Sequence, residues 1–226
     1  MDDLETIQGS VFLVRQAIPS GILLVAAAKT RSADEVNTAI DAGIGAVGYN
    51  YIQEAERMRP GVSDKVPWHL IGHLQRNKAK KAVQLFDMIE TIDSVELAWE
   101  VNKHCSRAGK KMPVLIEINS GRESNKTGVL PENAEQLIRE ISTLSHVNVQ
   151  GLMTMGPRFG NPEDARPYFQ ATRNVFDQID KLKIPHVEMR YLSMGMSNSY
   201  RIAIEEGATI IRIGSFLFGE RCRTGV

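Results

Sequence analysis

The first candidate for chemistry in this sequence is a lysine at the end of an apolar run. Lys29 follows residues 22–28 (ILLVAAA), whose unbroken apolar character predicts a strand covered on both faces, as in a parallel sheet. Ser32 and Glu35 have the spacing of a capping box and predict that a helix begins directly afterwards. Lys29 is therefore expected in a strand-to-helix loop, where α/β folds bind their ligands.

Two interpretations of Lys29 are open at this point. The side chain could leave the sheet and extend into solvent as an ordinary charged lysine. Alternatively, partial loss of hydration at the mouth of an apolar strand could free its amine for Schiff-base chemistry with a carbonyl compound. The rest of the chain has to decide between a solvated side chain and a nucleophile.

Two glycine-bearing segments near the carboxyl end could bind an anion. Residues 193–197 (SMGMS) precede a predicted helix, and residues 212–215 (RIGS) lie within the last predicted strand unit. Small residues allow backbone N–H groups to approach a phosphate, serine hydroxyls donate hydrogen bonds, and a helix N-terminus near Ser197 adds a favourable dipole. Each segment could equally be a turn that needs glycine for its geometry, so neither identifies a phosphate site alone.

Taken together, these features favour a pyridoxal phosphate site. A lysine at the end of the first strand can bind the aldehyde of this cofactor, and the two glycine-bearing segments can hold its phosphate. Arg212 lies between apolar neighbours and is expected to be buried beside them. The combination favours Lys29 as a nucleophile.

Composition excludes several other classes of protein. The 226 residues carry 27 basic and 27 acidic side chains, so no general attraction to nucleic acid or membrane is implied. Cys105 and Cys222 lie far apart, and His69 and His73 lie four apart in a predicted strand, so neither a disulfide scaffold nor a metal site is expected. An acidic start, where a secretory signal would be basic, favours a soluble cytoplasmic protein.

Strand and helix signals alternate along the chain, which predicts a single (β/α)8 TIM barrel with an extra N-terminal helix over residues 4–17. An open doubly wound sheet is the alternative, because alternation alone does not show closure. Asp93 and Glu96 are predicted to cap the helix that Gly109 ends. No linker divides the chain, so one domain over residues 1–226 is expected. The predicted strands are residues 22–28, 46–50, 68–72, 88–91, 114–119, 149–155, 189–192 and 209–218; the other predicted helices include residues 32–43, 51–58, 77–86, 165–182 and 199–206.

Several ordered motifs resemble one known family. From about residue 22 to residue 219, the chain is similar to the pyridoxal phosphate homeostasis proteins, which are related to the N-terminal barrel of alanine racemase. The resemblance implies a fold-type III pyridoxal phosphate-binding barrel. The motifs that carry it are residues 25–30 (VAAAKT), 48–54 (GYNYIQE), 68–78 (WHLIGHLQRNK), 192–197 (LSMGMS) and 212–215 (RIGS).

The resemblance also implies roles for individual residues. Lys29 would hold the cofactor as an internal aldimine, and Arg212 would face the pyridine nitrogen. A permanent cation there opposes protonation of that nitrogen and weakens the ring as an electron sink, which discourages carbanion chemistry. Asn50 and His69 would line the pocket. The phosphate would be held by Ser197, Gly214, Ser215 and the backbone of Met196.

Three positions depart from the usual family pattern. Tyr49 stands where the family commonly has Glu, and Ser199 stands where it commonly has Asp. These two changes affect hydrogen bonds around the pocket. Ser215 replaces a more usual Thr and keeps the hydroxyl.

Two functions follow from the resemblance. The first is a non-catalytic protein that holds pyridoxal phosphate for intracellular homeostasis and passes it to apoenzymes, most simply as a monomer. The second is an amino-acid racemase of the alanine type, which needs bases on both faces of the substrate α-carbon. Related racemases supply the second base from an additional domain, and this chain ends at Val226, shortly after the last predicted strand. Tyr49 or Tyr191 could in principle replace that base.

Overall fold

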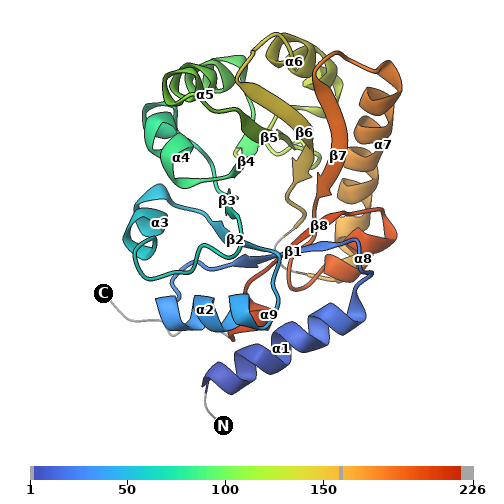
Figure 1. Cartoon of the computed structure of the whole chain (residues 1–226). Coiled ribbons are helices and arrows are strands. Elements are labelled where there is room, and N and C mark those ends of the chain that lie inside the picture. Colours follow the sequence, from blue (N-terminus) through green and yellow to red (C-terminus); the bar gives the residue numbers. More distant parts are fainter. Residues whose placement is uncertain (1–2, 158–159, 220–226) are drawn as a thin grey trace.

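Eight parallel strands form the centre of the molecule and close into a barrel (Figure 1). The computed structural model describes residues 3–157 and 160–219. Each strand pairs with the next in sequence, and the last pairs with the first, which confirms the barrel over the open sheet. The strands are β1 (Leu23–Ala27), β2 (Ala46–Tyr49), β3 (Trp68–Leu70), β4 (Met88–Ile92), β5 (Met112–Ile118), β6 (Val147–Thr154), β7 (Val187–Ser193) and β8 (Ile210–Ile213).

Helices surround the barrel, and short 3-10 turns precede three of them (Figure 1). These elements are α1 (Asp3–Ala17), α2 (Ala33–Asp41), α3 (Ile52–Met58), η1 (Arg76–Lys78), α4 (Ala79–Leu85), α5 (Val95–Ala108), η2 (Pro131–Asn133), α6 (Ala134–Ile141), η3 (Pro162–Ala165), α7 (Arg166–Leu182), α8 (Tyr200–Glu205) and α9 (Ser215–Phe218).

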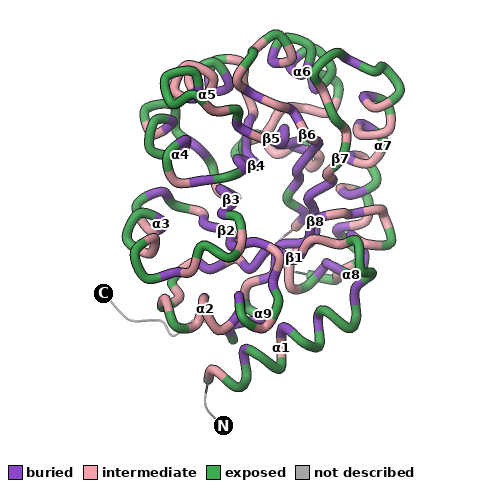
Figure 2. The backbone as a smooth tube through the Cα atoms, in the orientation of Figure 1, coloured by how far each residue is buried: buried purple, intermediate pink, exposed green. Residues whose placement is uncertain are grey.

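Most strands are buried along their length, β1 among them as the apolar run before Lys29 predicts, whereas the first half of β7 has exposed residues (Figure 2). On β1, Val25 packs inside the barrel, whereas Leu24 and Ala26 belong to the larger core between strands and helices. The alternation follows from the two-residue period of a strand. An apolar plug therefore fills part of the barrel interior; its buried members are Val25, Ala46, Ile71, Met88, Leu115, Met153 and Ile210.

The predicted N-terminal helix is present as α1. Ile7, Val11 and Val14 are buried at helical spacing, and they belong to the same core as the outer faces of the strands. Helix α1 lies against α2 and α9, beside the seam where β1 meets β8 (Figure 1).

Two local predictions are wrong. The last strand ends at Ile213, and α9 follows, because Leu217 and Phe218 both donate backbone hydrogen bonds to the Gly214 carbonyl and are both buried. Hydrogen bonds to one carbonyl from the amides three and four residues further on are those of a helical turn, not of a strand. Helix α5 has Ser94 rather than Asp93 at its N-cap, and no side chain accepts a hydrogen bond there.

None of the helices in the described part of the chain is both long enough and apolar enough to cross a membrane.

The capping box of α2 provides a stability prediction. The Ser32 hydroxyl accepts a hydrogen bond from the Glu35 amide, and the Glu35 carboxylate accepts one from the Ser32 amide. We expect Ser32→Ala to lower the free energy of unfolding by about 1 kcal/mol in urea denaturation. Ser94→Ala is the matched control, because this N-cap serine makes no capping bond. Equal losses of unfolding free energy in Ser32→Ala and Ser94→Ala would contradict a stabilising capping box at Ser32.

Candidate functional site

A cavity of about 810 Å³ opens at the carboxyl ends of the strands. Residues from every strand-to-helix connection except the fourth line it, so distant parts of the sequence meet there. The cavity includes most of the residues singled out from the sequence: Lys29, Asn50, Met196, Ser197, Arg212, Gly214 and Ser215.

Lys29 lies two residues beyond β1, and its side chain is half-buried at the cavity. Its Nζ atom is 3.4 Å from the Tyr51 hydroxyl and 4.7 Å from the centre of the Tyr51 ring. A cation over an aromatic face is stabilised by the ring quadrupole. The amine is therefore held against Tyr51 at the cavity rather than extended freely into solvent.

The loop that carries Lys29 is fixed by contacts on both sides. Thr30 adopts a left-handed backbone conformation (φ 65°), which is unfavourable for a β-branched residue. Its amide donates a hydrogen bond to the Glu54 carboxylate, and its hydroxyl donates to the Lys29 carbonyl. Arg31 donates hydrogen bonds to the carbonyls of Phe218 (2.7 Å) and Gly219 (2.6 Å). The lysine loop is thus tied to the carboxyl end of α9.

The pairing of β1 with β8 brings the lysine loop next to the second glycine-bearing segment. Val25 pairs with Arg212 in the parallel register. A Cβ atom at Gly214 would lie 3.3 Å from the Ala27 carbonyl oxygen, a close approach that glycine accommodates. Lys29 and the residues after β8 therefore face the same cavity.

The two glycine-bearing segments are joined by a hydrogen bond. The Ser197 hydroxyl accepts from the Phe216 amide, in the first turn of α9, at 3.3 Å. The Met196 amide donates to the Ser199 hydroxyl at 3.3 Å, so Ser199 supplies an acceptor where the family commonly has Asp. The group of serine hydroxyls and first-turn amides around Ser197 and Ser215 is a donor set suited to an anion.

Arg212 is the buried cation of the site and is 3% exposed. One guanidinium nitrogen donates to the Ser193 hydroxyl, and the other donates to the Thr154 carbonyl at 2.8 Å and lies 3.3 Å from the Met155 sulfur. Burial lowers the pKa of Arg212, while the nearby carboxylates Glu90 and Glu117 oppose that change. Arginine remains charged in proteins, so a fixed positive charge borders the cavity.

Glu90 compensates this charge from β4. The carboxylate is fully buried, accepts a hydrogen bond from the Ser193 hydroxyl at 2.6 Å, and lies 2.7 Å from the His69 Nδ1 atom. Burial alone would raise the pKa of Glu90, but His69, Arg212 and the Ser193 hydroxyl outweigh it and hold the pKa below its ordinary value. Glu90 is therefore ionised at neutral pH.

His69, which was expected to line the pocket, does not border the cavity. It is 3% exposed, and its ring is directed at Glu90. Because residues two apart on a strand share a face, His69 and Ile71 point to the same side of the chain, and Ile71, nearer the carboxyl end, borders the cavity.

Neither tyrosine considered as a racemase base borders the cavity. Tyr49 is fully buried and stacks on Trp68 with ring centres 4.9 Å apart. Burial, with the charge of Glu54, raises the pKa of Tyr49. Tyr191 packs against the apolar plug inside the barrel. The tyrosine that contacts the Lys29 amine is Tyr51, which lies two residues beyond the end of β2.

Four residues of the site were not identified from the sequence. Tyr51 and Glu54 lie in the motif at residues 48–54 that carries the family resemblance, so the sequence did point to both. Glu117 lies within a predicted apolar strand, where a carboxylate is unusual; burial raises its pKa, although the Thr127 hydroxyl donates to it at 2.8 Å. Glu90 gave no signal, because its partners come from three other strands.

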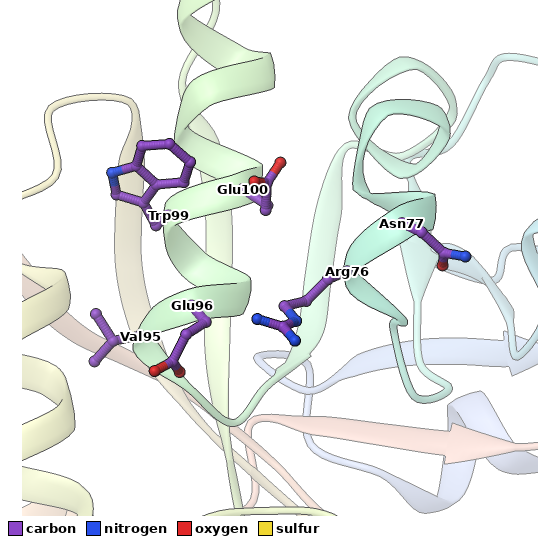
Figure 3. Close-up of a pocket in the computed structure, with 6 residues that line it drawn as sticks. All are labelled: Arg76, Asn77, Val95, Glu96, Trp99 and Glu100. Atoms are coloured by element: carbon purple, nitrogen blue, oxygen red, sulfur yellow. The ribbon is translucent and has the colours of Figure 1, made fainter.

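A second hollow lies away from this site. A groove of about 530 Å³ separates the first turns of α5 from η1, with Trp99 and Glu96 on one side and Arg76 on the other (Figure 3). Basic and acidic side chains both border it. None of the site residues predicted from the sequence lies there.

Comparison with known proteins identifies the family. The family model for the N-terminal domain of alanine racemase matches residues 3–222. The pyridoxal phosphate homeostasis protein of Aquifex aeolicus (strain VF5) is 40% identical over 199 residues, covering 88% of this chain and 86% of that protein. The protein of the same name from Mus musculus is 39% identical over 211 residues, covering 88% and 76%. The chain belongs to the family of pyridoxal phosphate homeostasis proteins.

Solved structures agree with the fold. PipY of Synechococcus elongatus PCC7942 with pyridoxal phosphate bound has a TM-score of 0.86 and 30% identity, covering 94% of this chain and 100% of that chain. An alanine racemase of Clostridium difficile 630 has a TM-score of 0.78 at 16% identity. It shares the barrel, and the present chain spans 58% of its length.

The support of the lysine loop generates a second prediction. We expect Glu54→Ala to lower the free energy of unfolding by about 1–3 kcal/mol, because the Thr30 amide loses a charged acceptor. Hydrogen exchange at the Thr30 amide should become faster. Glu56→Ala is the control: its exposed pair with Lys81 should be worth less than about 1 kcal/mol. Unchanged exchange at Thr30 would contradict the proposed support.

Proposed function

We propose that this protein binds pyridoxal 5'-phosphate covalently through Lys29 and serves intracellular homeostasis of the cofactor without robust catalysis. The observation that carries the proposal is the convergence, in one cavity, of a half-buried lysine amine with anion donors from two other loops and a buried arginine. When bound, pyridoxal phosphate supplies an electrophilic aldehyde for amines and an aromatic ring that can act as an electron sink.

The residues present fit each part of the cofactor. Lys29 supplies the nucleophilic amine, and Tyr51 orients that amine. Ser197, Gly214 and Ser215, with the backbone of Met196, hold the phosphate, and Asn50 contributes to the wall of the cavity.

Arg212 gives the site its non-catalytic character. A permanent cation beside the ring nitrogen opposes protonation of that nitrogen, so the ring is a poor electron sink. Racemisation also needs two bases on opposite faces of a substrate carbon, and the candidates Tyr49 and Tyr191 lie outside the cavity. The alternative, an alanine-type racemase, is supported by the shared barrel and by Tyr51 beside Lys29.

The protein works in the cytoplasm as a monomer and supplies apoenzymes that need pyridoxal phosphate. Cys105 is a buried free thiol, which suits a reducing compartment. Light scattering of the purified protein would test the monomer, since a mass of two chains would contradict it.

Borohydride reduction tests the covalent site. After incubation with pyridoxal phosphate and reduction, we expect one reduced cofactor per chain on the peptide that contains Lys29, measured by mass spectrometry. The label should be lost in Lys29→Ala and retained in Lys126→Ala, which removes the other lysine that borders the cavity. Label on a different lysine, or no label, would contradict the proposal.

A racemase assay separates the two functions. We expect the protein loaded with pyridoxal phosphate to leave L-alanine unchanged at a protein concentration at which an alanine racemase brings the two enantiomers to equilibrium. Chiral chromatography measures the two enantiomers. Interconversion that is abolished by Lys29→Ala and by Tyr51→Phe would instead support the racemase.

A further inference from the structure

A buried carboxylate beneath the cavity has no part in the proposed function as stated so far. Glu90 is 0% exposed, and both of its oxygens are engaged by residues from other strands. One oxygen lies 2.7 Å from Nδ1 of His69 on β3, and the other accepts from the hydroxyl of Ser193 on β7 at 2.6 Å. Because an ionised carboxylate only accepts hydrogen bonds, Nδ1 of His69 carries a proton.

Ser193 connects Glu90 to Arg212. Its hydroxyl accepts from the Arg212 guanidinium and donates to the carboxylate, so the three groups form a continuous chain of hydrogen bonds. The nearest guanidinium nitrogen is 3.9 Å from the carboxylate oxygen. Together with the Thr154 carbonyl at 2.8 Å, these contacts hold Arg212 in one orientation.

Stability alone does not explain why Glu90 and Arg212 are buried. Removing a carboxylate and a guanidinium from water is costly, and the pair recovers that cost only with good geometry. Arg212 borders the cavity, whereas Glu90 lies outside the residues that do. The geometry therefore points to a carboxylate that acts on the cavity through the arginine.

We propose that Glu90 is a positioning residue for the cofactor site: it holds Arg212 in place through Ser193 and offsets part of the charge that Arg212 presents to the cavity. This inference rests on the proposed function, because Arg212 faces the cofactor only when the cofactor is bound on Lys29. Glu90 thereby sets how strongly the bound cofactor retains a proton on the nitrogen that joins it to Lys29.

The charged groups around the pair determine the direction of the effect. His69 and Arg212 act on Glu90, and Glu90 and Glu117 act on Arg212. Replacing Glu90 by glutamine removes a negative charge, keeps a side chain of the same shape, and leaves only Glu117 to offset the charge of Arg212. A more positive site then weakens proton binding by the cofactor.

The test follows the visible absorption of the Lys29-bound cofactor as pH changes. In Glu90→Gln we expect the proton affinity of the linking nitrogen to fall about tenfold relative to the wild type, a shift of roughly one pH unit toward lower pH. Glu90→Asp keeps the charge, so its titration should change by less than about twofold even if thermal stability falls. Relative to the wild type, the double variant Glu90→Gln with Arg212→Gln should show only a small shift, because it loses one negative and one positive charge.

The outcomes separate the inference from the proposed function. An unchanged titration in Glu90→Gln, or equal shifts in the glutamine and aspartate variants, would show a merely structural role and overturn the inference. If Glu90→Gln does not fold, Glu90→Asp decides: a titration like the wild type supports the inference, and a large shift overturns it. A wild-type protein that shows no absorption from a Lys29-bound cofactor overturns the proposed function and the inference together.

Discussion

The pairing of the first strand with the last is the constraint on which the rest of the structure depends. Parallel register between β1 and β8 sets Val25 opposite Arg212 and places Gly214 against Ala27. Only a closed barrel brings residues almost 190 positions apart into this contact. The lysine amine, the anion donors and the buried cation share one cavity because of that closure.

The barrel interior contains an apolar plug and a buried pair of charged side chains. Residues such as Val25 and Leu115 fill the plug, as in other barrels of this kind. Glu90 and Arg212 place opposite charges in the protein interior, and Ser193 links them. Well-packed apolar side chains are often at least as stabilising as a buried ion pair. The charged pair is therefore best explained by what it does for the cavity.

The sequence predicted the fold and much of the site because their signals are local or repetitive. The apolar run before Lys29 and the capping box at Ser32 both form as predicted. The prediction failed where pairing in three dimensions decides the outcome. Glu90 acquires its partners only when β3, β7 and β8 meet β4, and α9 replaces the end of a predicted strand, where the Leu217 and Phe218 amides both donate to the Gly214 carbonyl.

A crystal structure of the protein grown with pyridoxal phosphate would show how Lys29 and Arg212 meet the cofactor. We expect continuous density from the Lys29 amine into the cofactor, with the phosphate at hydrogen-bond distance from Ser197 and Ser215 and the ring nitrogen beside Arg212. Density on another lysine, or a ring turned so that its nitrogen lies away from Arg212, would contradict the proposed site.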